Sequence, residues 1–122
     1  MSIFKIKRVY EKPEETDGYR VLVDRLWPRG IKKEALPYDL WAKQLAPSPD
    51  LRKWFHEDKD THWNEFAASY RKELSTSAYV KKFLEQVKSR PVITLLYAAK
   101  DTQQNHAIIL QQHLTQKQQE EE

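Results

Sequence analysis

Two short runs of the chain are almost continuously apolar, residues 20–24 and residues 91–99. Runs of β-branched and aliphatic residues of this length are typical of strands that are buried on both faces of a parallel sheet. Residues 3–10 alternate less regularly and carry three basic side chains, so a third strand with one solvent-facing side is expected there. The pattern predicts three main strands, near 3–9, 20–25 and 92–98.

Between the second and third runs, the apolar period becomes that of helices. Ser48, Pro49 and Asp50 form a typical helix start, with a capping hydroxyl, a first-turn proline and an early acid. The helical period predicts buried positions at Trp63, Phe66, Tyr70, Phe83, Leu84 and Leu110, with Leu95 on a strand. Helices are expected at about 49–56, 61–74, 77–89 and 103–116, the last one capped by Asp101 or Thr102. Strands separated by helices imply crossover connections, so the predicted class is α/β, with a small, mainly parallel sheet flanked by helices.

The 122 residues suit one domain, which we place at 1–114. Residues 115–122 lack large apolar side chains, so they are expected to fray as a polar tail. There is no cysteine, which excludes disulfides and thiol chemistry. No leader-like or membrane-spanning segment is recognisable, so a cytoplasmic protein with no membrane partner is expected.

The net charge is +3, but the chain ends in three glutamates. Without them 21 basic residues face 15 acidic ones, which gives the body of the protein a charge of +6. Such a charge favours a small anionic ligand or nucleic acid as partner, and it is equally typical of ordinary surface charge. Nothing in the sequence indicates an oligomeric state.

Charged residues gather where two predicted strands end. Asp24, Arg25 and Arg29 follow the second strand, and Lys100 and Asp101 follow the third. Ligands of parallel sheets bind beyond the carboxyl ends of the strands, so these five residues are expected in one crevice. Asp24, Lys100 and Asp101 are the catalytic candidates: an aspartate can act as general base or acid, and the lysine can stabilise negative charge. The arginines and the free N–H groups of residues 102–105, at the expected start of the last helix, would bind an anion.

Structural roles remain open for the same residues. Asp101 could cap the last helix and occupy its N–H donors, and Arg25 could pair with either aspartate. Trp27 and Trp41 could stack against a ring or belong to the core.

The histidines add little to this picture. His56 and His62 lie near Glu57, Asp58 and Asp60 but match no metal motif, so neither a metal nor a cofactor is expected. His106 is better placed, one turn into the last helix.

Several motifs of the chain resemble one family. Residues 17–30 (DGYRVLVDRLWPRG) are the most specific block, and it is accompanied by 41–43 (WAK), 46–48 (APS), 51–55 (LRKWF), 94–101 (TLLYAAKD) and 105–107 (NHA). They are similar to the domain-of-unknown-function 488 (DUF488) family, in its short YeaO-like branch, over about residues 3–114. The resemblance adds Lys43, Arg52, Tyr97 and Asn105 to the expected ligand-binding residues. Longer relatives carry Cys-His-Arg where this chain has Asn105, His106 and Ala107, so thiol chemistry does not transfer.

Two functions stay open at this point. One is an enzyme that acts on a phosphate-bearing or nucleotide-like ligand through Asp24. The other is a non-catalytic nucleic-acid-binding module that uses the same cations, with Trp27 and Trp41 as stacking surfaces.

Overall fold

The computed structural model describes residues 2–120, and it contains one fully parallel sheet. The strands of the sheet are β1 (Ile3–Arg8), β2 (Tyr19–Leu22), β3 (Leu40–Trp41) and β4 (Val92–Tyr97), in the order β1-β4-β2-β3. β4 is therefore central, paired with β1 from Ile3 opposite Val92 to Arg8 opposite Tyr97, and with β2 from Tyr19 opposite Ile93. The predicted α/β class and parallel sheet are confirmed.

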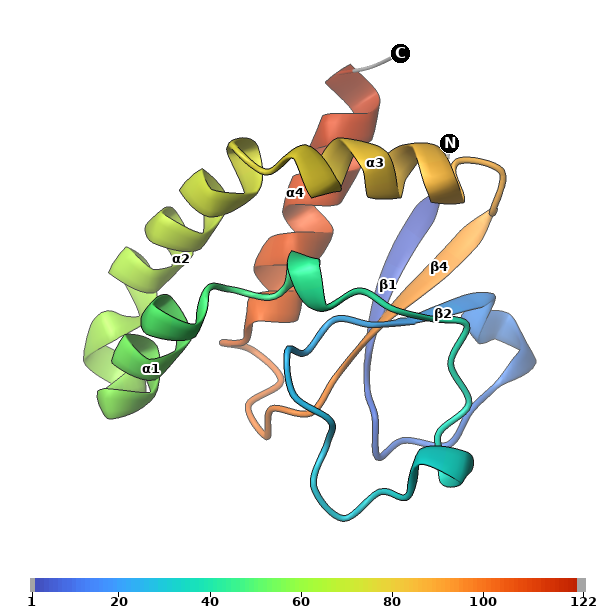
Figure 1. Cartoon of the computed structure of the whole chain (residues 1–122), viewed down its shortest axis with the longest axis horizontal. Helices are drawn as coiled ribbons and strands as arrows, with labels where there is room; N and C mark the ends of the chain where they lie inside the picture. The colour runs from blue at the N-terminus through green and yellow to red at the C-terminus, as the bar shows by residue number, and fades with distance from the viewer. Residues whose placement is uncertain (1, 121–122) are drawn as a thin grey trace.

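Four α-helices accompany the sheet within residues 2–120 (Figure 1). They are α1 (Pro49–Glu57), α2 (Lys59–Ser75), α3 (Ala78–Val87) and α4 (His106–Glu120). The Ser48 side chain accepts the Leu51 N–H at the start of α1, as the sequence predicts, and Asp58 caps α2 in the same way through Thr61. Short 3₁₀ helices lie at Glu15–Asp17, Lys33–Ala35 and Lys43–Leu45.

The two faces of the sheet are covered differently. Val21, Ile93 and Leu95 face the main core, which contains buried residues from all four helices. Leu22 and Leu96 point to the other face and pack under the irregular segment between β2 and β3. The helices therefore cover one face only, and α1 and α2 reach sideways past the sheet (Figure 1).

The predicted core positions are buried with one exception. Phe66, Tyr70, Phe83, Leu84, Leu95 and Leu110 are at most 6% exposed. Trp63 is only partly buried and packs at the border of the core.

Three details differ from the sequence prediction. β3 is an additional strand of two residues, paired with Val21 and Leu22. The last helix begins at His106 instead of 103, because Asp101 folds the preceding residues into a turn. It also continues to Glu120 through the segment expected to fray, where Gln118 exchanges hydrogen bonds with the Ser2 backbone. Glu121 and Glu122 lie outside the described residues.

Gly18 fixes the entry into β2. Its φ of 65° is one that side chains rarely adopt, and an added Cβ would lie 2.4 Å from the Val92 carbonyl oxygen. A glycine is therefore required for this turn to approach β4.

Candidate functional site

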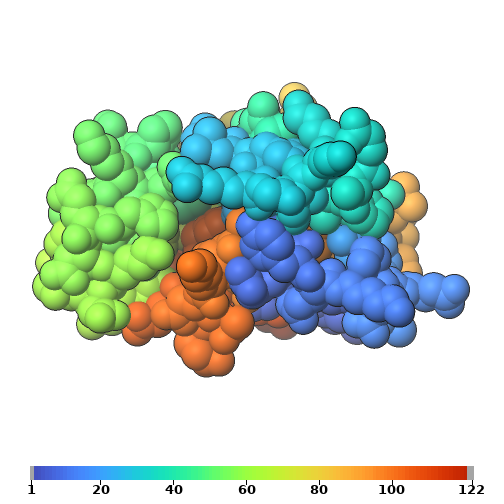
Figure 2. Space-filling model, turned by 90° about the horizontal axis from the view of Figure 1, so that it is seen from below, coloured from blue at the N-terminus to red at the C-terminus, as the bar shows by residue number. Residues whose placement is uncertain are grey.

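A cleft of about 530 Å³ opens beyond the carboxyl ends of β2 and β4. Its walls are the segment after β2, the segment after β4, and α1 with the start of α2. Seen from below the view of Figure 1, the surface is hollowed between these segments, and α4 is visible at the base (Figure 2). The position follows from the topology, since all strands run toward this edge.

Most of the predicted site residues line this cleft. They are Asp24, Arg25, Trp27, Arg29, Arg52, Lys100, Asp101 and Asn105. The structure therefore brings the ends of two strands together with a residue of α1, although no ligand contact tests the roles assigned to them.

Two predicted site residues lie outside the lining. The Lys43 ammonium sits 4.1 Å from the centre of the Trp41 ring. Tyr97 is 3% exposed and belongs to the main core, and burial raises the pKa of its hydroxyl. Neither side chain therefore borders the cleft: Lys43 is exposed beside Trp41, and Tyr97 is packed in the core.

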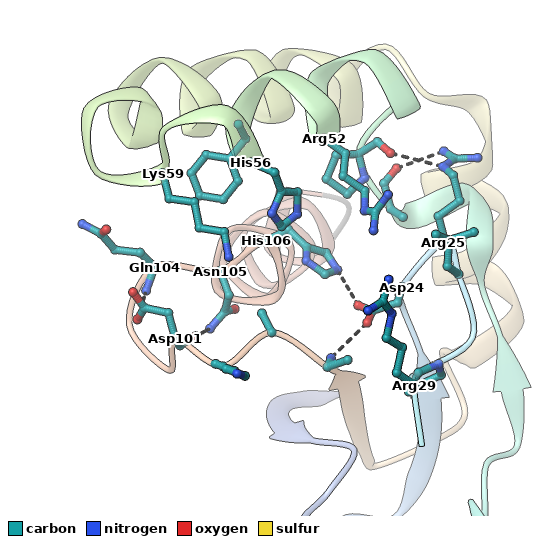
Figure 3. A pocket seen from close by; sticks show the side chains of 18 of the residues that line it. Asp24, Arg25, Arg29, Arg52, His56, Lys59, Asp101, Gln104, Asn105 and His106 are labelled. Carbon is teal, nitrogen blue, oxygen red and sulfur yellow. Dashed lines mark hydrogen bonds and ion pairs between the residues drawn. The ribbon is translucent and has the colours of Figure 1, made fainter. Parts of the chain in front are cut away.

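Five cationic side chains border the cleft: Arg25, Arg29, Arg52, Lys59 and Lys100. The ion pairs formed within residues 2–120 include none of the five. Arg25 does not pair with Asp24 but reaches the carbonyl oxygens of Pro47 and Ala46, at 3.3 and 3.4 Å (Figure 3). It thus joins the segment after β2 to the approach of α1. Arg29, Arg52, Lys59 and Lys100 are exposed at the rim.

Asp24 is held at the base of the cleft. Its Oδ2 accepts the Ala98 N–H at 2.9 Å, which ties the end of β2 to the end of β4. Its Oδ1 lies 3.1 Å from His106 Nε2, which is also 3.1 Å from the Val23 carbonyl oxygen (Figure 3). A carbonyl can only accept, so this nitrogen carries a hydrogen. Asp24 is thereby fixed by one backbone N–H at Oδ2, while Oδ1 lies buried against His106 and accepts no hydrogen bond within residues 2–120.

Asp101 takes the structural role that the sequence left open. Its Oδ1 accepts the N–H groups of Gln103 and Gln104, at 2.8 and 3.0 Å. These bonds hold the pKa of Asp101 below its ordinary value. Two of the donors expected to bind an anion, the N–H groups of Gln103 and Gln104, are therefore occupied by Asp101. The expected helix cap at Asp101 or Thr102 is wrong: Asn105 precedes α4 and caps it, with its Oδ1 accepting the Ile108 N–H.

The two tryptophans near the cleft are bound to the backbone. Trp27 Nε1 donates to the Ile31 carbonyl and Trp41 Nε1 to the Asp24 carbonyl. Their rings pack edge-on against each other, with centroids 5.4 Å apart. Trp27 borders the cleft and Trp41 does not. The two rings hold the segment between β2 and β3 against the face of the sheet that the helices do not cover.

Sequence reasoning missed the contribution of the α1–α2 corner. His56 and Lys59 border the cleft opposite the strand ends, and His106 lies at its base (Figure 3). Burial lowers the pKa of His56, and the charges of Lys59, Arg52 and His106 lower it further. The i, i+4 spacing of Arg52 and His56 was the available signal, because it puts both on one helix face.

The histidine and carboxylate side chains of the described residues do not suggest a metal site. Within residues 2–120, no group of three or more histidine and carboxylate side chains is arranged to hold an ion. Nor does any helix in that range have the length and apolar content that a membrane crossing needs.

Residues 3–122 match a family described as the inactive DUF488-N3 subclade, and the chain belongs to the DUF488 family. The resemblance drawn from the sequence motifs is confirmed.

The chain is similar to several uncharacterised proteins over most of their length. Escherichia coli K12 YeaO is 48% identical over 104 residues, which cover 85% of this chain and 90% of YeaO. The Mycobacterium tuberculosis H37Rv protein Rv3073c and the Mycobacterium bovis protein Mb3100c are each 40% identical over 110 residues, 90% of this chain and 92% of theirs. No solved structure matches the chain.

Proposed function

We propose that this protein binds a small phosphate-bearing ligand in the cleft at the end of β2 and β4. The observation that carries the proposal is the set of five cleft cations, none of which makes an ion pair within residues 2–120. Grouping like charges around a cavity costs electrostatic energy unless an anion binds there. Arginine in particular offers the bidentate donors that suit phosphate.

Binding is favoured over catalysis by the state of the two aspartates. Asp101 accepts two backbone N–H groups, and Asp24 accepts a third while it lies against His106. A general base has to reach a substrate proton. Asp101 Oδ1 and Asp24 Oδ2 are occupied in holding the loops, and Asp24 Oδ1 is buried against His106, away from the exposed cations of the rim. The description of the matched subclade as inactive agrees with a binding role.

Nucleic acid is the weaker alternative. A single-strand binder presents aromatic faces along a groove, whereas Trp27 and Trp41 pack edge-on with their N–H groups bonded internally. Salt dependence separates the two ligands: a polyanion loses affinity steeply with salt, and a small ligand much less so.

The test is calorimetric titration with inorganic phosphate, ribose 5-phosphate, AMP and a single-stranded oligonucleotide, at two salt concentrations. We expect one of the small phosphates to bind and Arg52→Ala to weaken it about tenfold, or ~1.4 kcal/mol. Arg52 is exposed, so its loss should leave the fold intact.

Lys82→Ala is the matched control, because Lys82 is an exposed cation on α3 outside the cleft lining. Binding by the control should equal that of the wild type. If no small phosphate binds, or if Arg52→Ala and Lys82→Ala behave alike, the proposal is wrong.

A further inference from the structure

The α1–α2 corner places a titratable group among fixed charges. Arg52 and His56 are one helical turn apart on α1, and Lys59 is the first residue of α2. All three side chains border the cleft, and Figure 3 shows them directed toward its interior from the same corner. His106 faces them from the start of α4. Among Arg52, His56 and Lys59, His56 is the one that can change charge near neutral pH.

We propose that His56 is an anion-binding residue of the cleft that is neutral when the cleft is empty and takes up a proton when a phosphate dianion enters, so that the ligand is a phosphomonoester. This inference rests on the proposed function and names the ligand class for the same cleft. The proton comes from the buffer and makes the imidazole a cation; no covalent bond changes.

The charges around His56 explain the neutral state. The nearest are cations or an imidazole on three helices: Arg52, Lys59 and His106. The far wall contributes further groups of both signs from the two strand ends: Asp24, Arg25, Arg29, Lys100 and Asp101. His56 is exposed on one side and partly removed from water by the cleft wall; this partial burial lowers its pKa, and the neighbouring cations add to that effect. The empty cleft therefore disfavours the protonated ring.

An anion reverses this balance. A dianion seated between Arg52 and Lys59 would cancel the field of both cations at His56, and it would attract a charged imidazole directly. A phosphomonoester carries nearly two negative charges at neutral pH, with a second pKa near 6. A phosphodiester carries one charge and cannot gain the second, so it compensates fewer of the five cleft cations.

The experiment compares ribose 5-phosphate with its methyl diester. Affinity is followed by nuclear magnetic resonance titration, and proton uptake by calorimetry in two buffers of different ionisation enthalpy near pH 7. For the wild type we expect the monoester to bind at least about tenfold more tightly than the diester. Binding should be accompanied by uptake of a fraction of a proton.

Two substitutions of the exposed His56 isolate its role. His56→Gln should bind the monoester about tenfold more weakly and without that uptake, and His56→Lys should restore affinity without it. His62→Gln is the control, because the ring of His62 stacks on Trp54 and does not line the cleft. It should keep both affinity and proton uptake.

Equal binding of the diester, or proton uptake that survives in His56→Gln, overturns the inference and leaves the proposed function standing. A wild-type protein that binds neither compound overturns both.

Discussion

Charged side chains meet in two regions of this molecule, and they are arranged in opposite ways. The Asp17 cluster, formed by Lys7, Glu14, Asp17 and Arg20, lies on the face of the sheet away from the helices. There Asp17 pairs with Lys7 at 2.8 Å and with Arg20, and all three side chains are at most 10% exposed. In the cleft, five cations stand without an ionic partner within residues 2–120.

This difference teaches that charges without an ionic partner indicate a candidate site better than the number of charges does. In the Asp17 cluster each charge satisfies another, and the Asp17 carbonyl also accepts the Thr94 hydroxyl of β4. Such a network holds the loop before β2 in place. In the cleft, the carboxylates are bonded to backbone groups and the cations are left available. The first arrangement pairs its charges internally, although Arg20 Nη2 has no hydrogen-bond partner within residues 2–120, and the second leaves five cations without ionic partners in that range.

The largest effect is expected from breaking the Asp17 cluster. Asp17→Asn leaves the nearly buried Arg20 without a carboxylate and Lys7 with only the exposed Glu14, and an uncompensated buried charge costs about 3–5 kcal/mol. Urea unfolding of the variant, followed by circular dichroism, measures this loss.

Glu14→Gln is the control for that substitution. Glu14 also contacts Lys7, but its side chain is 62% exposed, so its loss should cost about 1 kcal/mol or less. Equal effects of Asp17→Asn and Glu14→Gln would contradict the contrast between the buried pair and the exposed one.

A smaller loss of stability is expected when the pH is lowered. Burial raises the pKa of Asp17, but the hydrogen bonds from Lys7, the Glu14 backbone and Arg20 outweigh it and lower the pKa below the ordinary 3.8. Its stabilising contribution is therefore complete above pH 3.8 and is lost as the pH falls below that value. The Asp17 hydrogen bond raises the pKa of Lys7 despite burial, so that contribution persists to at least pH 10.5.

Protonation of His113 should lower the stability of the fold at a higher pH than protonation of Asp17 does. Burial and Lys117 lower the pKa of His113, so stability should begin to fall as the pH drops below 6.5. Thermal unfolding between pH 8 and pH 3 should show this early loss, and His113→Gln should reduce it. A wild-type melting temperature that stays constant down to pH 4 would contradict the assignment.

The smallest effect on stability is expected in the cleft itself. Lys100→Ala removes an exposed cation that has no ionic partner within residues 2–120, so the free energy of unfolding should change by no more than about 0.5 kcal/mol. Urea unfolding provides the measurement, with Asp17→Asn as the sensitive reference. A loss above about 1 kcal/mol would show that this cation is structural.

The sequence predicts those helices and strands whose own residues show a regular pattern of apolar positions. β4 and α3 are continuous or periodic in apolar residues, so their burial follows from their own pattern. β3 has only Leu40 and Trp41, and its hydrogen bonds depend on β2 being beside it. The start of α4 depends on which N–H groups Asp101 accepts, and several capping patterns were equally compatible with the sequence.

The candidate site shows the same limit. Asp24 and Lys100 could be placed together because parallel strands end at one edge. Lys59 could not, because its position depends on how α1 and α2 pack past the side of the sheet. The helical spacing of His56 links it to Arg52 but not to the strand ends. Lys43 and Tyr97 are near the site in sequence, but the packing of the Trp41 ring and of the core directs them elsewhere.

The central position of β4 has a consequence for the order in which the protein is assembled. β1 and β2 come from the first 22 residues, yet each of them pairs with β4, which begins at Val92. During synthesis, both early strands remain without this partner until three-quarters of the chain has been made. The pairing of β1 and β2 with β4, and with it the cleft edge, therefore forms late, as expected for contacts between distant parts of a chain.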